Sequence, residues 1–383
     1  MPIAYFRVGN RCVEHNRRSG TRSGQEGTIQ VRAVVAVFDS AETASHPVAG
    51  LPAAARALHR LAQAGVELGV IAAPGLSAPD PLLEAEVRRL CPNMEWLFTE
   101  PSVLPSGVPE AAPVVPGEAL LEGALPDLAA APQLGSGPDA LAAMPAALSR
   151  AAMRDAAARI VRATAKPGDG IVSRHLNRPI SQACTRLLLG LFPRIRPIHA
   201  TFGTAAIALA MAFALLGGTE RGLVLGALLF QAASIFDGVD GEIARATWRS
   251  SPQGAALDSL IDALTNLACV AGVAWNLHLQ GQERAAMAGA LGLVAMGLGL
   301  WVLGRRSRKD AGGMTFNAVK DRFSQRPSAI KQWLTWLTMR DFYALAGAVL
   351  IAAGFAHFAL YAFAVVAVGW LAVVLTVMMR EPA

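Results

Sequence analysis

The chain has 383 residues, of which 53% are hydrophobic and 16% are charged, and its formal net charge is +6. An average soluble domain has about a quarter of its residues charged, so this composition excludes an ordinary soluble protein. The four cysteines are widely scattered, and nothing in their spacing indicates a disulfide framework or a thiolate metal site. Charge density falls after about residue 180, which predicts a soluble part followed by a membrane part.

The first part is predicted to be a small α/β domain on the cytoplasmic side. Residues 1–30 are basic and lack a following apolar core, so we expect a disordered arm rather than a secretory signal. Residues 31–150 alternate apolar runs typical of strands with amphipathic segments typical of helices. We expect a Rossmann-like parallel sheet, with strands over 31–40, 66–73 and 94–100 and helices over 51–65 and 80–91.

Residues 151–197 form the predicted linker between the two parts. Within it, residues 180–195 carry apolar side chains on one side and are too short and too charged to span a bilayer. We expect an amphipathic helix that lies in the membrane interface before the first span. A core helix of the soluble domain is the alternative.

Residues 198–383 are predicted to be a bundle of six transmembrane helices. Each span needs about 20 mostly apolar residues. The second span is long enough only if it continues into Asp237 and Asp240, and the third begins with Asp258 and Asp262. The expected spans are residues 199–218, 222–240, 255–279, 285–304, 342–355 and 358–379.

The loop between the fourth and fifth spans sets the expected orientation. Residues 305–340 contain nine lysine and arginine residues and two aspartates. The positive charge of this loop alone is therefore larger than the net charge of the whole chain. Such a loop is typical of the cytoplasmic side. We therefore expect an integral protein of a bacterial or archaeal-type cytoplasmic membrane, with both termini and the acidic cluster facing the cytoplasm.

Four aspartates mark the cytoplasmic ends of the second and third spans. Asp258 and Asp262 are spaced i, i+4 on one helical face, and Asp237 and Asp240 are spaced i, i+3 on the preceding helix. Unpaired carboxylates at this depth are costly and indicate function. Mg²⁺ or Mn²⁺ binds carboxylate oxygen, and a pair of ions would suit four carboxylates and chemistry on phosphate esters.

The residues beside the aspartates fit a phosphate ligand. Gly238 and Gly241 leave room for a ligand to approach closely, and Arg245 lies where a guanidinium can hold a phosphate bidentately. The alternatives are a structural charge cluster, a cation-coupled transporter and an aspartate-rich prenyl-diphosphate transferase.

Residues 237–262 read D-x2-D-G-x2-A-R-x8-G-x3-D-x3-D, and this stretch resembles the signature of the CDP-alcohol phosphotransferase (CDP-alcohol phosphatidyltransferase) family. The resemblance implies a membrane enzyme that passes a phosphoalcohol from a CDP-alcohol to an acceptor hydroxyl and releases CMP. The fixed positions all match, and they are Asp237, Asp240, Gly241, Ala244, Arg245, Gly254, Asp258 and Asp262.

The resemblance also implies roles for the four aspartates. Asp237, Asp240 and Asp258 would bind the metal ions. Asp262 would help at the metal and act as general base on the acceptor hydroxyl. The chemistry implied is therefore metal-dependent transfer of a substituted phosphate group.

Further contacts with the substrates are implied outside the aspartates. Gly241 and Arg245 would hold the CDP group, and Ser251 stands where the family often has a hydroxyl that contacts CDP. Thr201, in a variant of the family's P-N-x-x-T element, would face the nucleotide. Arg340 is the candidate for holding the phosphate of the acceptor.

The implied partners follow from the same reaction. The donor would be CDP-diacylglycerol or a CDP-inositol-like polyol, and the acceptor a polyol phosphate or a lipid alcohol. Membrane lipids and a second copy of the chain in a homodimer are expected as well, and no nucleic acid is expected. The implied setting is phospholipid or polyol-phosphate biosynthesis, within lipid metabolism.

The soluble part carries a second resemblance. Residues 46–71 resemble the start of sugar-phosphate nucleotidyltransferases, and residues 166–181 resemble the junction in proteins that fuse a cytidylyltransferase to a di-inositol-phosphate phosphate synthase. The glycine-rich, arginine-containing phosphate loop that should follow the first strand is absent. The domain is therefore interpreted as degenerate, with docking, regulation or dimer contacts as its expected role.

Overall fold

The structure is a computed structural model that describes residues 31–103, 107–136, 150–307 and 339–380. The expected basic arm (1–30) and most of the basic loop (308–338) lie outside the described residues. The chain divides into two compact units. The N-terminal unit combines residues up to Thr164 with Arg186–Ile195 and Ala246–Trp248, and the membrane unit combines Ala165–Thr185, Arg196–Arg245 and the remainder.

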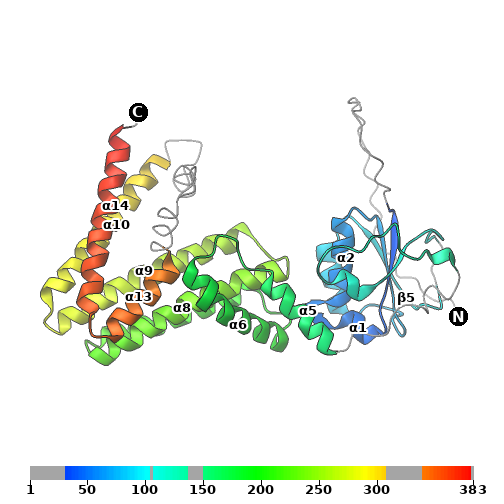
Figure 1. The fold of residues 1–383 in the computed structure, drawn as a ribbon, viewed down its shortest axis with the longest axis horizontal. Coiled ribbons are helices and arrows are strands. Elements are labelled where there is room, and N and C mark those ends of the chain that lie inside the picture. Colours follow the sequence, from blue (N-terminus) through cyan, green and yellow to red (C-terminus); the bar gives the residue numbers. More distant parts are fainter. Residues whose placement is uncertain (1–30, 104–106, 137–149, 308–338, 381–383) are drawn as a thin grey trace. The chain divides into compact units, whose positions relative to one another are not determined.

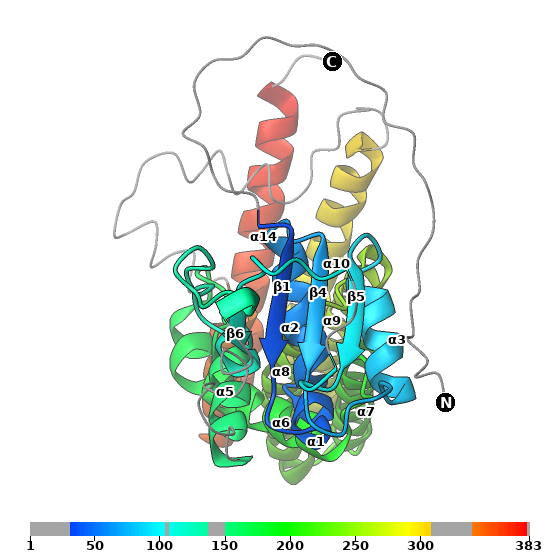
Figure 2. The ribbon, with the colours of Figure 1, turned by 90° about the vertical axis from the view of Figure 1, so that its right-hand side faces the viewer.

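A small parallel sheet forms the centre of the N-terminal unit (Figure 2). Its strands are β1 (Ala33–Val37), β4 (Leu68–Ala72), β5 (Glu95–Thr99) and β6 (Val114–Pro116), in the order β5-β4-β1-β6. All neighbouring strands are parallel. Every residue of β1 is buried, as a central strand covered on both faces requires. The prediction of a small parallel sheet is therefore confirmed.

Helices pack against this sheet and contribute to its apolar core. They are α1 (Ala41–Ser45), α2 (Ala53–Gln63), α3 (Pro81–Leu90) and α5 (Arg150–Arg162), with a short antiparallel pair, β2 (Pro47–Val48) and β3 (Leu51–Pro52), before α2. The helix α3 starts where the sequence indicates, because Asp80 accepts hydrogen bonds from two backbone N–H groups of the first turn and Pro81 takes the first helical position. The helix α5 was not expected from the sequence.

Arg56 is a buried charged residue in the N-terminal unit. Only 2% of it is exposed, and its guanidinium donates hydrogen bonds to the carbonyls of Val48, Ala49 and Ala246. It also lies 4.7 Å from the ring centroid of Trp248. These contacts engage Nη2 of the guanidinium where water cannot reach it, whereas the buried Nε has no hydrogen-bond partner among the described residues.

The membrane unit is built from long apolar helices (Figure 1). Five of them are long and apolar enough to cross a membrane, and they are α7 (Pro197–Leu216), α8 (Glu220–Ala246), α9 (Pro252–Leu279), α10 (Glu283–Ser307) and α14 (Ala356–Arg380). Large apolar side chains such as Phe213 and Val365 are exposed on these helices, by 67% and 72%. Such exposure suits contact with lipid rather than with water.

The sixth expected span is not confirmed among the described residues. The corresponding helix, α13, runs from Arg340 to Ala352 and has 13 residues. At a rise of 1.5 Å per residue it is about 20 Å long, which is less than the roughly 30 Å of a hydrocarbon core. The six-span count therefore stays a prediction.

The expected amphipathic helix is present as α6 (Arg178–Leu191), which follows a π-helical turn over Ser173–Asn177. Its polar side chains Ser181 and Thr185 are buried, whereas Leu187 and Leu191 are exposed by 61% and 63%. A helix that turns its apolar side outward has the character expected of an interfacial helix. No membrane accompanies the structure, so its interfacial position stays a prediction.

Candidate active site

The four aspartates of the signature lie on two helices, with Asp237 and Asp240 on α8 and Asp258 and Asp262 on α9. The carboxyls of Asp240 and Asp258 contact each other. Asp240 is buried, with 7% exposed, and it accepts a hydrogen bond of 2.6 Å from the hydroxyl of Thr201 on α7. Thr201, expected to face the nucleotide, thus contacts one of the expected metal ligands.

Arg340 connects the other two aspartates. It begins α13, and its Nη1 atom lies 3.3 Å from Oδ1 of Asp237 and in direct contact with Oδ1 of Asp262. The side chain of Arg340 is only 14% exposed. Arg340 was expected to hold an acceptor phosphate; the structure places it at Asp237 and Asp262, and its contact with a phosphate stays a prediction.

The donor set fits a hard divalent cation by its chemistry. Four carboxylates from two helices supply the oxygen ligands that Mg²⁺ and Mn²⁺ prefer. Within the described residues, however, no three acidic, histidine or cysteine side chains already stand together in a metal-holding arrangement. The guanidinium nitrogen of Arg340 supplies the positive charge between Asp237 and Asp262. A divalent cation there would compete with Arg340 for the same oxygens.

Two glycines of the signature region make room for arginine side chains. A Cβ at Gly241 would lie 2.9 Å from Nη1 of Arg245. A Cβ at Gly238 would lie 2.9 Å from Nη1 of Arg178, on the preceding helix α6. The expectation was that these glycines admit a ligand directly. In this structure the neighbouring space is taken by the guanidinium groups of Arg245 and Arg178.

Ser251 has a structural contact at the start of α9. It is the N-cap residue, and its hydroxyl accepts a hydrogen bond of 3.0 Å from the backbone N–H of Gly254. Ser, followed by Pro252 at the first helical position, is a common helix start. Its expected contact with CDP stays a prediction beside this capping role.

A polar cavity of about 240 Å³ lies beside the aspartates within the membrane unit. Asp237, Asp262 and Arg340 line one part of it. The remaining wall comes from the segment before and within α6, including Asp169 and Arg178. A compact polar ligand that enters this cavity would therefore meet Asp262, the expected general base.

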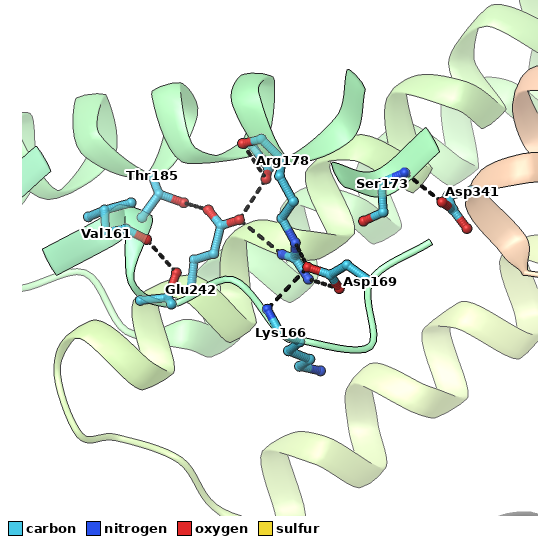
Figure 3. A network of polar contacts seen from close by, with 10 residues as sticks. Val161, Lys166, Asp169, Ser173, Arg178, Thr185, Glu242 and Asp341 are labelled. Atoms are coloured by element: carbon cyan, nitrogen blue, oxygen red, sulfur yellow. Dashed lines mark hydrogen bonds and ion pairs between the residues drawn. The ribbon is translucent and has the colours of Figure 1, made fainter. Parts of the chain in front are cut away.

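Four charged residues at this site were not singled out from the sequence as functional. They form part of a polar network that joins the segment before α6 to α8 and α13, and they are Asp169, Arg178, Glu242 and Asp341 (Figure 3). A functional role for Glu242 could have been predicted from the sequence, because it is an additional ionisable residue inside a membrane helix. Roles for Asp169 and Arg178 could not, since their sequence neighbourhood reads as a polar junction.

The contacts within this network favour the ionised forms of Asp169 and Arg178. Burial by itself would raise the pKa of Asp169, but its hydrogen bonds and ion pair with Arg178 outweigh this and lower that pKa below its usual value. Burial likewise opposes the charge on Arg178, and the two carboxylates Asp169 and Glu242 outweigh it and raise the pKa of the guanidinium. The pair therefore stays ionised at neutral pH.

Comparison with known proteins finds matches to part of the chain. Residues 196–378 match the family model of CDP-alcohol phosphatidyltransferase. A "Bifunctional IPC transferase and DIPP synthase" from Rubrobacter xylanophilus is 34% identical over 190 residues, which cover 50% of this chain and 40% of the relative. A protein of the same name from Thermococcus kodakarensis is 41% identical over 95 residues, covering 25% of this chain and 20% of the relative. The chain thus matches less than half the length of these relatives.

Proposed function

Because residues 196–378 form a CDP-alcohol phosphatidyltransferase domain, we propose that this protein transfers a phosphoalcohol from a CDP-alcohol to an acceptor hydroxyl and releases CMP. The observation that carries the proposal is the convergence of the signature aspartates beside a polar cavity, where Arg340 joins Asp237 to Asp262. We further propose that the reaction takes place at the cytoplasmic leaflet and in a homodimer, as expected from the charge distribution and the family.

The acceptor is activated by a carboxylate in this proposal. Asp262 removes the proton of the acceptor hydroxyl, and the acceptor oxygen attacks the phosphorus that carries the alcohol. A new P–O bond forms to the acceptor, the bond to the CMP oxygen breaks, and CMP leaves with the electron pair. Asp262 is 31% exposed and lines the cavity, so an acceptor there reaches it without unfolding of the helix.

The pyrophosphate of the donor needs positive charge. Two divalent cations held by Asp237, Asp240, Asp258 and Asp262 would neutralise it and stabilise the leaving CMP. Arg245 binds a donor phosphate, and Gly241 permits this because it leaves space for that guanidinium. Thr201 holds the carboxyl of Asp240 in a fixed orientation through its hydrogen bond.

The cavity supports a phosphorylated polyol as the acceptor. Its lining is rich in groups that bind hydroxyls, such as Asp169, Ser173 and Asn177, and it contains Arg340 for a phosphate. A lipid alcohol would instead need an apolar path for its chains. For the donor, the proposal keeps both CDP-diacylglycerol and a CDP-inositol-like polyol.

The test is CMP release by the purified full chain in detergent. Mn²⁺ or Mg²⁺ is supplied, CDP-diacylglycerol and CDP-inositol are offered separately, and inositol phosphate, glycerol phosphate or a lipid alcohol serves as acceptor. We expect CMP from one donor with a polyol phosphate, and loss of that CMP in Asp262→Asn. Folded wild-type protein that releases no CMP with any combination would contradict the proposal.

A further inference from the structure

A buried arginine connects the cavity wall to the signature helix. Arg178 donates two hydrogen bonds to Asp169, from Nε at 2.7 Å and from Nη2 at 3.0 Å. Its third nitrogen, Nη1, donates to Oε1 of Glu242 on α8 at 3.0 Å (Figure 3). One guanidinium therefore holds a carboxylate from each of two segments that are far apart in the sequence.

These groups are almost completely shielded from water. The side chain of Glu242 is 0% exposed, and those of Arg178 and Asp169 are 13% and 11% exposed. Ser181 and Thr185 donate hydrogen bonds of 2.6 Å to the two oxygens of Glu242. Every oxygen of Glu242 thus has a protein partner. A buried ion pair with this many hydrogen bonds holds its side chains in one arrangement. If one partner moved away, water could not take its place.

The two ends of this network lie at functionally different places. Glu242 follows Gly241 directly and stands between Asp240 and Arg245, inside the signature. Asp169 lies in the wall of the cavity that Asp262 and Arg340 also line. Lys166 closes the wall segment by donating its backbone N–H to Asp169 at 3.1 Å. The position of the wall relative to the signature therefore depends on Arg178.

Gly238 provides independent support for this close fit. Gly238 and Glu242 are spaced i, i+4, so they lie on the same face of α8. A Cβ at Gly238 would lie 2.9 Å from Nη1 of Arg178 and 3.4 Å from Oγ of Ser181. Even one methyl group on this face would therefore push Arg178 away from Glu242.

We propose that Arg178 is a positioning residue for the acceptor. By joining Asp169 to Glu242, it holds the cavity wall at the distance from Asp262 and Arg340 that a polyol phosphate requires. This inference rests on the proposed function, and it assigns a role to residues outside the signature. Arg178 acts through the wall rather than on the reacting atoms, so the loss of the pair weakens use of the acceptor and leaves binding of the CDP-alcohol unchanged.

The experiment measures kcat and separate KM values for donor and acceptor in the full chain. The variants are Arg178→Gln, Arg178→Lys, Glu242→Gln, the double variant Arg178→Gln/Glu242→Gln, and Gly238→Ala, which removes no charged group. Arg174→Gln is the matched control, because Arg174 is an exposed arginine one helical turn before Arg178. Size-exclusion profiles and thermal unfolding of each variant in detergent show which of them are folded.

We expect Arg178→Gln and Glu242→Gln each to raise the acceptor KM about tenfold or more, with the donor KM within about twofold of wild type. The double variant should resemble either single variant, because both remove the same pair. Arg178→Lys should rescue little, since lysine cannot bind Asp169 bidentately. Gly238→Ala should raise the acceptor KM in the same direction.

Several results would contradict the inference. An active wild type with folded variants whose acceptor KM is unchanged, or whose donor and acceptor KM rise equally, would leave the network a purely structural feature. Additive effects in the double variant would show that Arg178 and Glu242 do not act as one pair. A folded wild type that releases no CMP would contradict the proposed function, and this inference with it.

Discussion

Thr201 contacts one of the expected metal ligands through a single hydroxyl. It is buried on α7, with 4% exposed, and donates a hydrogen bond of 2.6 Å to Asp240. Thr201→Val keeps the shape of the side chain and removes this donor. We therefore expect kcat to fall about tenfold and the apparent affinity for Mn²⁺ to weaken. Thr201→Ser should retain most activity. Titration of CMP release with Mn²⁺ measures both effects.

A neighbouring residue provides the control for that prediction. Thr204 is equally buried, with 2% exposed, but its hydroxyl donates only to the carbonyl of Ala200 in its own helix. Thr204→Val should therefore remain close to wild type. Equal losses in both variants would show that α7 tolerates no valine there, and would remove the specific role given to Thr201.

At the residue scale, the part of the site that lies within one stretch of helix could be predicted from the sequence. The i, i+4 spacing of Asp258 and Asp262 fixes their common face whatever the surroundings. Contacts between distant segments could not be predicted in this way. Arg178 contacts both Asp169 and Glu242 only because the segment before α6 packs against α8. No local sequence pattern predicts that packing.

Among the elements, the start of α9 allows a test of the two roles given to Ser251, the helix N-cap and the expected contact with CDP. If the hydroxyl serves mainly as N-cap, Ser251→Ala should lower the free energy of unfolding by about 1 kcal/mol. Ser251→Asp should restore that stability, because aspartate is also a good cap. It should also raise the donor KM, since the new negative charge lies where we expect the pyrophosphate. An aspartate variant as unstable as the alanine variant would argue against the capping role.

The helix α2 carries a second testable feature, the environment of His59. A carbonyl can only accept, so Nδ1 of His59 donates to the carbonyl of Leu90 at 3.0 Å, and Nε2 accepts from Gln63. The imidazole also contacts the ring of Trp248 in a tilted arrangement, with ring centroids 4.4 Å apart. Burial, together with the guanidinium groups of Arg89 and Arg56, lowers the pKa of His59 below its usual value.

The lowered pKa of His59 predicts a pH dependence of stability. As the pH falls through the ordinary histidine pKa of about 6.5, the unfolded chain binds a proton before the folded chain does. The N-terminal unit should therefore lose stability as the pH falls from about 7.5 to about 5.5, seen as a drop in its unfolding temperature. His59→Gln should reduce this slope, whereas His175→Gln, which removes an exposed histidine of the other unit, should not. The same slope in both variants would contradict the prediction.

The elements of the N-terminal unit were largely predictable for a physical reason. Alternation of apolar runs with amphipathic segments located β1, α2, β4, α3 and β5, because burial on both faces leaves a distinct pattern in the sequence. The helix α5 was missed, since its alanine-rich and arginine-rich sequence has a weak apolar face. It joins the core through Met153 and Ala156, a contact that depends on the tertiary fold.

For the whole molecule, the number of spans decides where the C-terminus lies. Five helices among the described residues meet the requirements of a span, and α13 is short. If α13 completes a sixth crossing, both termini lie on the same side. We expect this outcome, with a cytoplasmic C-terminus, from the basic loop before α13.

Green fluorescent protein fused to the C-terminus should then fluoresce in a bacterial host, and a periplasmic phosphatase fusion at the same point should be inactive. The reverse pattern would indicate five crossings.

The central claim is that the alcohol's own phosphate moves to the acceptor while CMP leaves. The most direct measurement uses a polyol-phosphate acceptor labelled with ¹⁸O in its hydroxyl groups, incubated with a CDP-alcohol, Mn²⁺ and the full chain. Mass spectrometry of the products then locates the label. The account predicts that the phosphodiester product retains ¹⁸O, that CMP contains none, and that Asp262→Asn forms neither. A labelled phosphodiester between cytidine 5′-phosphate and the acceptor, or CMP formed without a phosphodiester product of the alcohol, would contradict it.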